Sequence, residues 1–337
     1  MSDSRSDANV SPEDPPTSDG VSRLHFEVDW PPKHAAAYLI ESPDRAPILI
    51  DAGDPTDRGT ETMIDELAAR GYEPADVGAV IVTHPHTDHT GQVPLFVAAG
   101  VPVYAPDPVL EQLERDEADL VAGVREVARS AGLRGEAIEK QVDRARDSLQ
   151  RNRDLLDPDE ARPYSFDGVF SIDGRTFEPI HTPGHQIHHA SLGTVIDGDR
   201  VLFSGDALIE PFRAAALHVG LDHGAYESID AFYVAMDRLE SVAPAAERAY
   251  PGHGPVFEDV EGVVHDTRYE LDTLVADTLE AVRAAGPATP VELTRHRVGE
   301  SRHPAQLLDT IGALGRLQSG GAIVRERDDG MRYYRSA

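Results

Sequence analysis

The sequence predicts a mixed α/β fold, with one large domain followed by a smaller module, in a chain of 337 residues. Short apolar runs typical of strands occur in two groups, before residue 105 and again between residues 164 and 251, and helical patterns flank both groups. A charged helical stretch, residues 107–162, separates the two groups. We therefore expect two sets of strands with flanking helices, packed in layers and interrupted by a helical insertion.

The chain begins with a polar segment and then turns to strand-like patterns. Residues 1–20 are rich in Ser, Asp and Pro with almost no large apolar residue, so we expect a disordered acidic tail. Apolar and polar residues alternate over residues 24–28, and residues 36–40 lead toward an apolar run that ends at Asp51. A helix should follow over residues 60–69 and lie outside the first sheet. Its apolar positions, which we expect on one side, are Met63, Ile64 and Leu67.

A cluster of side chains suited to metal binding follows the apolar run at residues 80–82. His84, His86, Asp88 and His89 arrive within six residues. Alternate side chains of an extended segment share a face, so the first two histidines point the same way, and the turn after them brings the other two from a second side. Imidazole and carboxylate together suit zinc and similar cations, so this stretch could serve two of them. A histidine-rich surface turn is the alternative, and four such residues directly after an apolar strand argue against it.

The charged stretch, residues 107–162, should form a helical hairpin. Two apolar stripes at helical spacing run through it, and Gly132 and Gly135 break the helical pattern between them. One interpretation is a lid or a dimer element beside the metal groove, because insertions near a site commonly control access to it. The other is a solvated, stabilising decoration. Each apolar stripe must be buried against some surface, which favours the interpretation as a lid or a dimer element. The stripes consist of Leu110, Leu113, Leu120, Val124 and Val127, and of Ile138, Val142, Ala145 and Leu149.

The second half of the chain returns to strands. A hairpin is predicted around Asp197-Gly198-Asp199, a turn sequence that favours two-residue hairpin loops. Residues 228–239 should form a helix. The strands are expected at residues 164–170, 176–181, 191–196, 201–203 and 248–251.

The last part, residues 263–337, predicts a linker helix and a small domain. The helix covers residues 263–283, two more helices follow, and two short strands at residues 322–325 and 331–334 end the chain. Residues 287–337 carry eight arginines against six carboxylates, a local charge of +2 in a chain whose remainder is −31. A relatively basic module could contact phosphate, or its arginines could serve packing or dimerisation, and we hold both alternatives open.

The cluster after residue 82 resembles the His-x-His-x-Asp-His signature of the metallo-β-lactamase superfamily. Four further motifs stand in that superfamily's order, each after an apolar or small-residue run, and together they cover residues 21–262. They carry Asp51 in Ile50-Asp51-Ala52-Gly53, His185 in Thr182-Pro183-Gly184-His185, Asp206 in Ser204-Gly205-Asp206, and His253 in Pro251-Gly252-His253-Gly254. The resemblance implies an αβ/βα sandwich with metals at one edge. The C-terminal helices and hairpin resemble the winged helix of the β-lactamase-like endoribonuclease group.

The resemblance also implies a role for each motif residue. His84, His86 and His185 would hold a first metal, Asp88, His89 and His253 a second, and Asp206 would bridge them. Asp51 would orient a ligating histidine, and Asp88 would act catalytically by orienting the attacking hydroxide shared by the two cations. Zinc is the first choice of metal, with iron or manganese left open. His181, His188 and His189 flank His185 and are interpreted as packed or solvated, with a role in substrate binding or in orienting a ligand left open. His218 and His223 follow Asp206 in a segment that could line the groove, and are weak candidates for the site.

Several reactions fit one such site, because fold and metal do not fix the substrate. The leading hypothesis is hydrolysis of a small-molecule thioester or ester, as in members similar to hydroxyacylglutathione hydrolase. The second is an endoribonuclease acting on single-stranded RNA through the C-terminal domain. Iron-dependent thiol or persulfide oxidation and a metal-sensing, nucleic-acid-binding regulator are further alternatives. The complete ligand set weighs against both.

Composition limits the environment. The chain has 31 Lys and Arg against 60 Asp and Glu, a formal charge of −29, which is typical of proteins from salt-accumulating halophiles. It has no cysteine, so metal ligation must use histidine and carboxylate. Neither a signal peptide nor a membrane-spanning run is evident, so cytoplasm is the expected location, without a membrane partner. A homodimer remains open.

Overall fold

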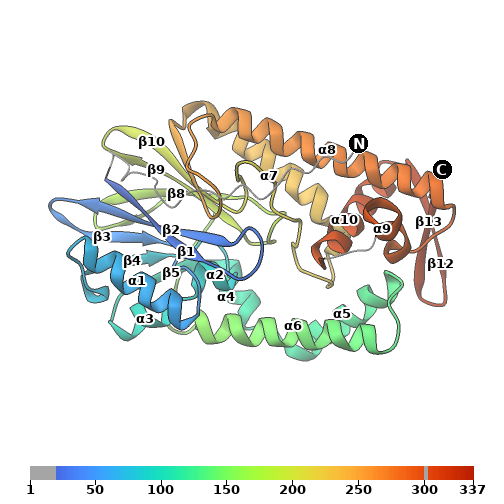
Figure 1. Ribbon diagram of the computed structural model, residues 1–337, viewed down its shortest axis with the longest axis horizontal. Helices are drawn as coiled ribbons and strands as arrows, with labels where there is room; N and C mark the ends of the chain where they lie inside the picture. Colours follow the sequence, from blue (N-terminus) through green and yellow to red (C-terminus); the bar gives the residue numbers. More distant parts are fainter. Residues whose placement is uncertain (1–19, 300–302) are drawn as a thin grey trace.

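The computed structural model describes residues 20–299 and 303–337 of the chain. They form two large β-sheets, helices packed on the outer faces of both, and a C-terminal module with its own two-stranded sheet (Figure 1). The tail expected at residues 1–20 lies outside the described residues apart from Gly20.

The first sheet contains six strands in the order β1-β2-β3-β4-β5-β6. The first three pair antiparallel, and β3 to β6 pair parallel, so their carboxyl ends meet at one edge. Their bounds are β1 Val21–Glu27, β2 His34–Ser42, β3 Arg45–Ile50, β4 Ala79–Ile81, β5 Val103–Pro106 and β6 Arg162–Tyr164.

The second sheet contains five strands in the order β11-β10-β9-β8-β7. The turn between β9 and β10 is Asp197-Gly198, and both residues have positive φ, as a tight hairpin turn requires. Strands β10 and β11 pair parallel, so their carboxyl ends also lie together. The bounds are β7 Phe170–Ile172, β8 Arg175–His181, β9 Ala190–Ile196, β10 Asp199–Gly205 and β11 Arg248–Pro251.

The core is divided into layers, as the alternation of side chains along β2 shows. Ala37 and Leu39 face a cluster shared with the helices α1 (Asp57–Ala69) and α3 (Val93–Ala98), whereas Tyr38 and Ile40 face a cluster between the two sheets. A third cluster joins the second sheet to the helices α7 (Ser228–Val242) and α8 (Val260–Ala285). The order helix, sheet, sheet, helix confirms the predicted mixed α/β sandwich.

Two details of the sequence prediction are wrong. Ile64 of α1 is 42% exposed, whereas Met63 and Leu67 are fully buried, because the helix presents a narrower stripe to the sheet than its composition suggests. Residues 164–170 are not one strand: β6 ends at Tyr164 in the first sheet, and β7 begins at Phe170 in the second. The turn residues Asp167 and Gly168 carry the chain across between them.

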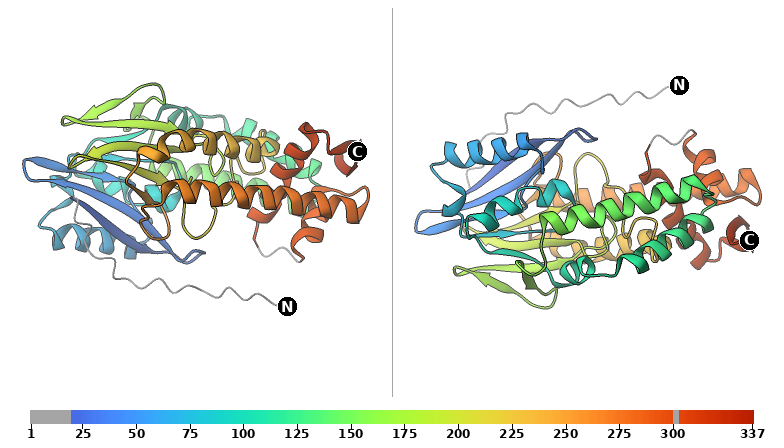
Figure 2. Two further views of the ribbon diagram at one scale, coloured as in Figure 1. Left: turned by 90° about the horizontal axis from the view of Figure 1, so that it is seen from above. Right: turned by 90° about the horizontal axis from the view of Figure 1, so that it is seen from below.

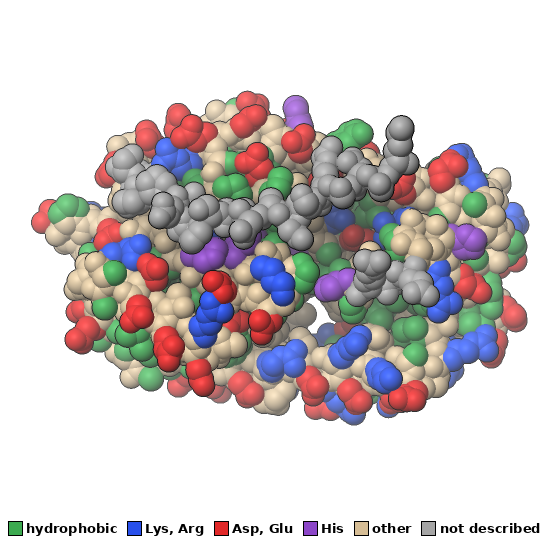
Figure 3. All heavy atoms as spheres, viewed as in Figure 1, with side chains coloured by type: hydrophobic (Ala, Val, Ile, Leu, Met, Phe, Trp, Pro, Cys, Tyr) green, Lys and Arg blue, Asp and Glu red, His purple; other side chains and the backbone are tan. Residues whose placement is uncertain are grey.

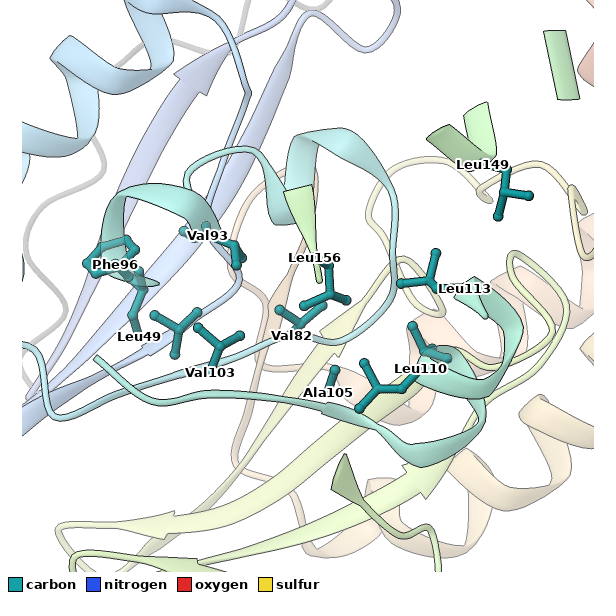
Figure 4. Close-up of a cluster of buried hydrophobic side chains, with 14 of the residues drawn as sticks. Leu49, Val82, Val93, Phe96, Val103, Ala105, Leu110, Leu113, Leu149 and Leu156 are labelled. Carbon is teal, nitrogen blue, oxygen red and sulfur yellow. The ribbon is translucent and has the colours of Figure 1, made fainter. Parts of the chain in front are cut away.

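The insertion forms the helical hairpin that the glycine break predicts. After α4 (Asp107–Leu113) come α5 (Glu117–Ser130) and α6 (Glu136–Leu155), which pack antiparallel. Figure 4 shows the apolar side chains of α4 and the end of α6 continuing the core of the first sheet: Leu110, Leu113, Leu149 and Leu156 extend the group formed by Val82, Val103 and Ala105. The apolar stripes are therefore buried within this chain.

The C-terminal module follows the long helix α8. It consists of α9 (Pro290–Val298), α10 (Ala305–Ser319) and a hairpin of β12 (Ile323–Asp328) and β13 (Met331–Ser336). Thr289 caps α9 in a reciprocal capping box with Glu292. Two helices followed by a hairpin is the order expected for a winged helix, and that assignment remains a prediction. Among the described residues, no helix is both long and apolar enough to cross a bilayer.

The module is joined to the sandwich from two opposite faces. Figure 2 shows α7 and α8 side by side on one face and α5 and α6 on the other. The end of α8 and the end of α5 meet the module in one apolar cluster, through Val282 and Val127. The remaining short elements are α2 (Thr87–Thr90) and three 3₁₀ turns, η1 Pro74–Asp76, η2 Ala225–Glu227 and η3 Ala243–Ala245.

Candidate metal centre

The metal-binding side chains gather where strands of both sheets end. Asp51 follows β3, the cluster beginning at His84 follows β4, Asp206 follows β10 and His253 follows β11. His185 lies in the loop between β8 and β9. Since these strand ends lie at one edge of the sandwich, residues from five distant segments converge there.

The potential ligand atoms fall into two groups, within each of which they lie no more than 4.8 Å apart. The first group is His84, His86, His185 and Asp206, and the second is Asp88, His89 and His253. All seven residues proposed as ligands from the sequence are thus brought together. All except the half-buried His86 are buried.

Asp206 lies between the two groups. Its Oδ2 atom is 3.1 Å from Nε2 of His185 in the first group and 3.3 Å from Nε2 of His253 in the second. Its Oδ1 atom is 3.4 Å from Nε2 of His89. The carboxylate therefore offers one oxygen or the other to both sets of imidazoles.

Two buried atoms at this junction have no hydrogen-bond partner in the described parts of the chain, namely Oδ1 of Asp206 and Nε2 of His89. Leaving such atoms buried and unpaired costs about 1–3 kcal/mol each. Gly252 keeps the space beside them open, because a Cβ there would lie 2.3 Å from Oδ1 of Asp206. An acceptor-only carboxylate and an imidazole nitrogen facing one space form a donor set that fits a cation.

The other ring nitrogens of these histidines are held by hydrogen bonds. Nδ1 of His89 donates to Oδ2 of Asp51 (2.8 Å), Nδ1 of His185 donates to the Ala215 carbonyl (2.9 Å), and Nδ1 of His253 donates to the His34 carbonyl (2.5 Å). Each bond fixes the tautomer, so that Nε2 presents its lone pair to the cluster.

Asp51 is also connected to His84, through hydrogen bonds with Thr83. Asp51 accepts hydrogen bonds from the backbone N–H and the hydroxyl of Thr83, and the Thr83 oxygen lies 3.0 Å from Nδ1 of His84. Because the hydroxyl donates to the carboxylate, its oxygen accepts a hydrogen bond from Nδ1–H of His84. Asp51 thus orients one histidine in each group.

The pKa values of the clustered histidines differ according to the charged and neutral groups around each ring. Burial, assisted by the nearby imidazoles His89, His86 and His189, holds the pKa of His84 well below its usual value, and burial beside His185 lowers the pKa of His86 to about 3. Burial alone would also lower the pKa of His89, but the carboxylates Asp206, Asp51 and Asp88 raise it well above the usual value. The imidazoles of His84 and His86 are therefore neutral near pH 7, the form that binds metals.

Asp206 itself is held in its charged form. Burial would raise the pKa of this carboxyl group, but His253, His89 and His185 hold it well below its usual range. A buried carboxylate among imidazoles supplies the negative charge that offsets the cost of burying a cation.

His189 has a structural role that the sequence did not assign. Its Nε2 atom accepts a hydrogen bond from the backbone N–H of Asp206 (2.9 Å), and its Nδ1 atom lies 2.7 Å from the hydroxyl of Thr182. Gly205 leaves room for this ring, because a Cβ there would lie 2.6 Å from Nε2 of His189. His189 therefore positions the turn that carries Asp206, and its place four residues after His185 was the signal available.

The other flanking histidines lie around the cluster or away from it. Nε2 of His181 donates to the Ile187 carbonyl (2.7 Å), and the backbone N–H of the buried His218 donates to the His185 carbonyl (2.7 Å). His188 is partly buried in the same loop. His223 is exposed and lies 4.0 Å from Glu126, away from the cluster.

A layered α/β sandwich with a buried histidine and aspartate cluster at one edge defines a class of metal-binding protein. The family model described as the metallo-beta-lactamase superfamily matches residues 30–253. The chain belongs to the metallo-beta-lactamase superfamily, whose members are usually hydrolases.

Similar proteins of known name are distant. A lactamase-like protein, nscB, from Arthroderma benhamiae is 27% identical over 257 residues, which cover 74% of this chain and 44% of that protein. An atrochrysone carboxyl ACP thioesterase from Passalora fulva is 25% identical over 273 residues, 78% of this chain and 63% of that protein. The chain thus spans less than two thirds of the length of these relatives.

Two crystal structures share the fold over nearly the whole chain. A metallo-beta-lactamase family protein from Thermus thermophilus has a TM-score of 0.77 at 23% identity, covering 94% of this chain and 99% of that one. A beta-lactamase domain protein from Burkholderia ambifaria has a TM-score of 0.72 at 20% identity, covering 94% and 93%. A share of 94% is too large to leave out the C-terminal module, so the module belongs to the shared architecture.

Proposed function

We propose that the protein is a hydrolase that uses two divalent cations to cleave thioesters or related esters. The observation that carries the proposal is the Asp206 carboxylate, which lies between two groups of ligand atoms and keeps a buried oxygen without a partner among the described residues. A site for a single cation would need only one of the two groups.

In this proposal, His84, His86 and His185 would hold one cation, Asp88, His89 and His253 would hold the other, and Asp206, which lies between the two groups, would contribute to both. Bound cations of this kind supply Lewis acidity and lower the pKa of coordinated water toward about 7. Zinc suits imidazole and carboxylate ligands, and iron or manganese fits the same donor set.

The chain's own residues then prepare the reaction. Asp51 and the Ala215 and His34 carbonyls keep the imidazoles of His89, His185 and His253, respectively, in one tautomer and orientation. Asp88 lies on the first turn of α2 with Oδ2 at 3.4 Å from Nε2 of His253, where it would orient the attacking water.

A thioester suits this cluster because its leaving group can depart without a proton from a protein side chain. A thiol has a pKa near 8.5, so a thiolate departs without a positioned acid, whereas an amine or an alkoxide needs one. We assign no side chain of the cluster as a separate general acid. The named thioesterase among the distant relatives supports the same substrate chemistry.

Cleavage of single-stranded RNA is the second candidate, and the observation in its favour is the exposure of Arg325 and Arg327 on β12. Other arginines of the module are engaged within the protein: Arg297 donates to the Gln306 carbonyl, and Arg332 stacks on Tyr226 at 3.8 Å. These contacts support the packing alternative for the local excess of arginine. Iron-dependent thiol oxidation and a metal-sensing regulator fit less well, since neither requires the second ligand group.

The first experiment measures thiol release from a panel of acyl thioesters in molar KCl, with and without a chelator. A thiol-reactive dye is suitable because the chain contains no cysteine and gives no background of its own. Release that stops with chelator and returns with zinc is the expected result, and Asp206→Ala should abolish it. No release from any thioester by protein that holds two cations per chain would overturn the proposal and favour RNA cleavage, tested with the double variant Arg325→Gln and Arg327→Gln.

A further inference from the structure

A large cleft leads away from the metal centre. It has a volume of about 760 Å³ and begins at Pro85, His86 and Gln186, beside the ligands. It continues between the hairpin of α5 and α6 and the C-terminal module, where Figure 3 shows the molecular surface hollowed, with Lys and Arg side chains along the lower edge. Pockets of about 300–1,000 Å³ bury most of the surface of a drug-sized ligand, so the cleft is far larger than the scissile group alone requires.

One wall of the cleft is a line of polar side chains on α6. Gln141, Arg144, Ser148 and Asn152 follow one another at spacings of three, four and four residues, which places them on one face of the helix. Within residues 20–299 and 303–337, none of these side chains makes a hydrogen bond or an ion pair. The wall therefore offers amide and hydroxyl groups that are available to a ligand.

The opposite wall is apolar. It combines the loop after β10 with the module, through Leu217, Val219, Leu221, Leu307 and Leu308. Apolar side chains beside the polar row, such as Leu120, Val124 and Leu149, line the cleft as well. A cleft that combines a row of hydrogen-bonding groups with an apolar lining fits an extended ligand that has both amide groups and apolar carbon, rather than a purely apolar chain.

Two arginines give the cleft a positive end. Arg144 on α6 and Arg295 on α9 both line it, both are exposed, and neither has an ion-pair partner in the described parts of the chain. A third lining arginine, Arg115, is instead paired with the buried carboxylate of Asp222 at 2.6 Å. In a chain with a net charge of −29, guanidinium groups without carboxylate partners on two facing elements indicate an anionic ligand.

The arrangement fixes how far the anion lies from the reaction. The C-terminal end of α6 packs into the core beside Val82, next to the metal cluster, so Asn152 is at the metal end. Arg144 is eight residues earlier on the same helix, which corresponds to about 12 Å along the axis at 1.5 Å per residue. A phosphate bound by Arg144 would therefore lie about 12 Å farther along the cleft than a group bound by Asn152.

We infer that the cleft binds the phosphorylated, amide-bearing arm of a thiol carrier, the arm found in coenzyme A and in acyl carrier protein. The inference rests on the proposed thioester hydrolysis and names its substrate class. The α6 wall bonds the amides of the arm, the leucines cover its carbon chain, and Arg144 and Arg295 bind its phosphate. Hydrolysis then adds one water: a C–O bond forms at the acyl carbon, the C–S bond breaks, and the carrier leaves as a thiol with the water's remaining proton, so no oxidant or reductant is needed.

Binding can be tested without turnover, by titrating the full chain calorimetrically with S-hexyl-coenzyme A, a thioether that cannot be hydrolysed. Arg144→Gln and Arg295→Gln should each weaken binding about tenfold, because each removes one charge-assisted contact with phosphate. Arg151→Gln is the matched control, since Arg151 is exposed on the same helix and does not line the cleft. The lowest KCl concentration that keeps the protein folded should be used, because salt screens these contacts. Affinities of both cleft variants within twofold of the control would overturn the inference.

Substrates with shortened arms separate this inference from the proposed function. The hexanoyl thioester of coenzyme A should have a KM at least about tenfold lower than that of N-acetylcysteamine, which lacks the phosphate, and only the former should respond to Arg144→Gln. Chelator-sensitive hydrolysis of both thioesters with equal KM would leave the function standing and refute the cleft assignment. Arginine-dependent binding of S-hexyl-coenzyme A without hydrolysis of any thioester would support the cleft and refute the function.

Discussion

Replacing Asp309 by alanine should destabilise the protein and weaken metal binding, although this residue lies on α10 in the C-terminal module. Its Oδ2 atom accepts a hydrogen bond from Arg213 at 2.8 Å, and its Oδ1 atom accepts one from the backbone N–H of Ala216 at 2.9 Å. The bonded segment also supplies the Ala215 carbonyl that orients His185. Asp309 is therefore connected to a potential metal ligand through one short loop.

The magnitude follows from burial. The Arg213 and Asp309 side chains are 8% and 14% exposed, and removing one partner of a buried ion pair costs about 3–5 kcal/mol, because the other charge is left without compensation. Asp309→Asn keeps an acceptor for the Ala216 N–H and should cost less, about 2 kcal/mol. Much of the cost is the stranded charge, so the double variant Arg213→Ala with Asp309→Ala should be no less stable than Asp309→Ala alone.

The assay is urea unfolding followed by circular dichroism in molar KCl, with zinc affinity measured on the same samples. Asp328→Ala is the control, because Asp328 is an exposed carboxylate in the same module and its loss should change stability by no more than about 0.5 kcal/mol. Zinc affinity should fall about tenfold in Asp309→Ala, as when a group that orients a ligand is removed. A destabilisation below about 1 kcal/mol, or equal to that of the control, would refute the proposed coupling.

Three further predictions concern the metal centre, acid and salt. Asp206→Asn should lower the metal content by at least one cation per chain, measured by elemental analysis, whereas the exposed Asp199→Asn should leave it unchanged; equal content in both would contradict the bridging role. Stability of the metal-free protein should fall as the pH is lowered from about 6.5 toward 4. Burial, with neighbouring charges, lowers the pKa of three histidines to about 4, so over this pH range the unfolded chain binds more protons than the folded chain does. A urea midpoint that stays constant across this range would contradict the prediction. These histidines are His34, His188 and His218. Raising KCl from about 0.1 M to about 1 M should raise the urea midpoint, because the screening length falls from about 10 Å to 3 Å, and an unchanged midpoint would refute the halophilic interpretation.

The sequence predicted most elements because their signals are local. The strand ends before Asp51, Asp206 and His253 are marked by apolar runs that stop at a polar residue, and the hairpin turn by Asp197-Gly198. A local signal fails where two short elements adjoin. The stretch from Tyr164 to Phe170 has a strand-like composition throughout, and only its pairing partners show that it belongs to two sheets.

The arrangement of the candidate site could be predicted from the sequence only in part. Motif order placed seven residues at strand ends, but the bond from His189 to the Asp206 backbone depends on how the β8–β9 loop folds back. The cleft could not be predicted from the sequence, because its lining comes from segments around residues 112, 145, 219 and 307. Which faces of these segments meet is decided by packing between distant parts of the chain.

The two connections between the sandwich and the C-terminal module have a consequence for selectivity. Helix α8, with 26 residues, and helix α6, with 20, are about 39 and 30 Å long, and both extend between the sandwich and the side of the molecule where the C-terminal module lies (Figure 1). Helix α8 joins an apolar cluster with the sandwich through Leu271 and one with the module through Val282. Helix α6 joins the sandwich cluster through Leu149 and packs against α5, whose Val127 lies in the module cluster. In the inferred binding mode, the spacing between Arg295 and the metal edge would depend on the lengths of these two helices, and so would the length of the ligand that the cleft accepts.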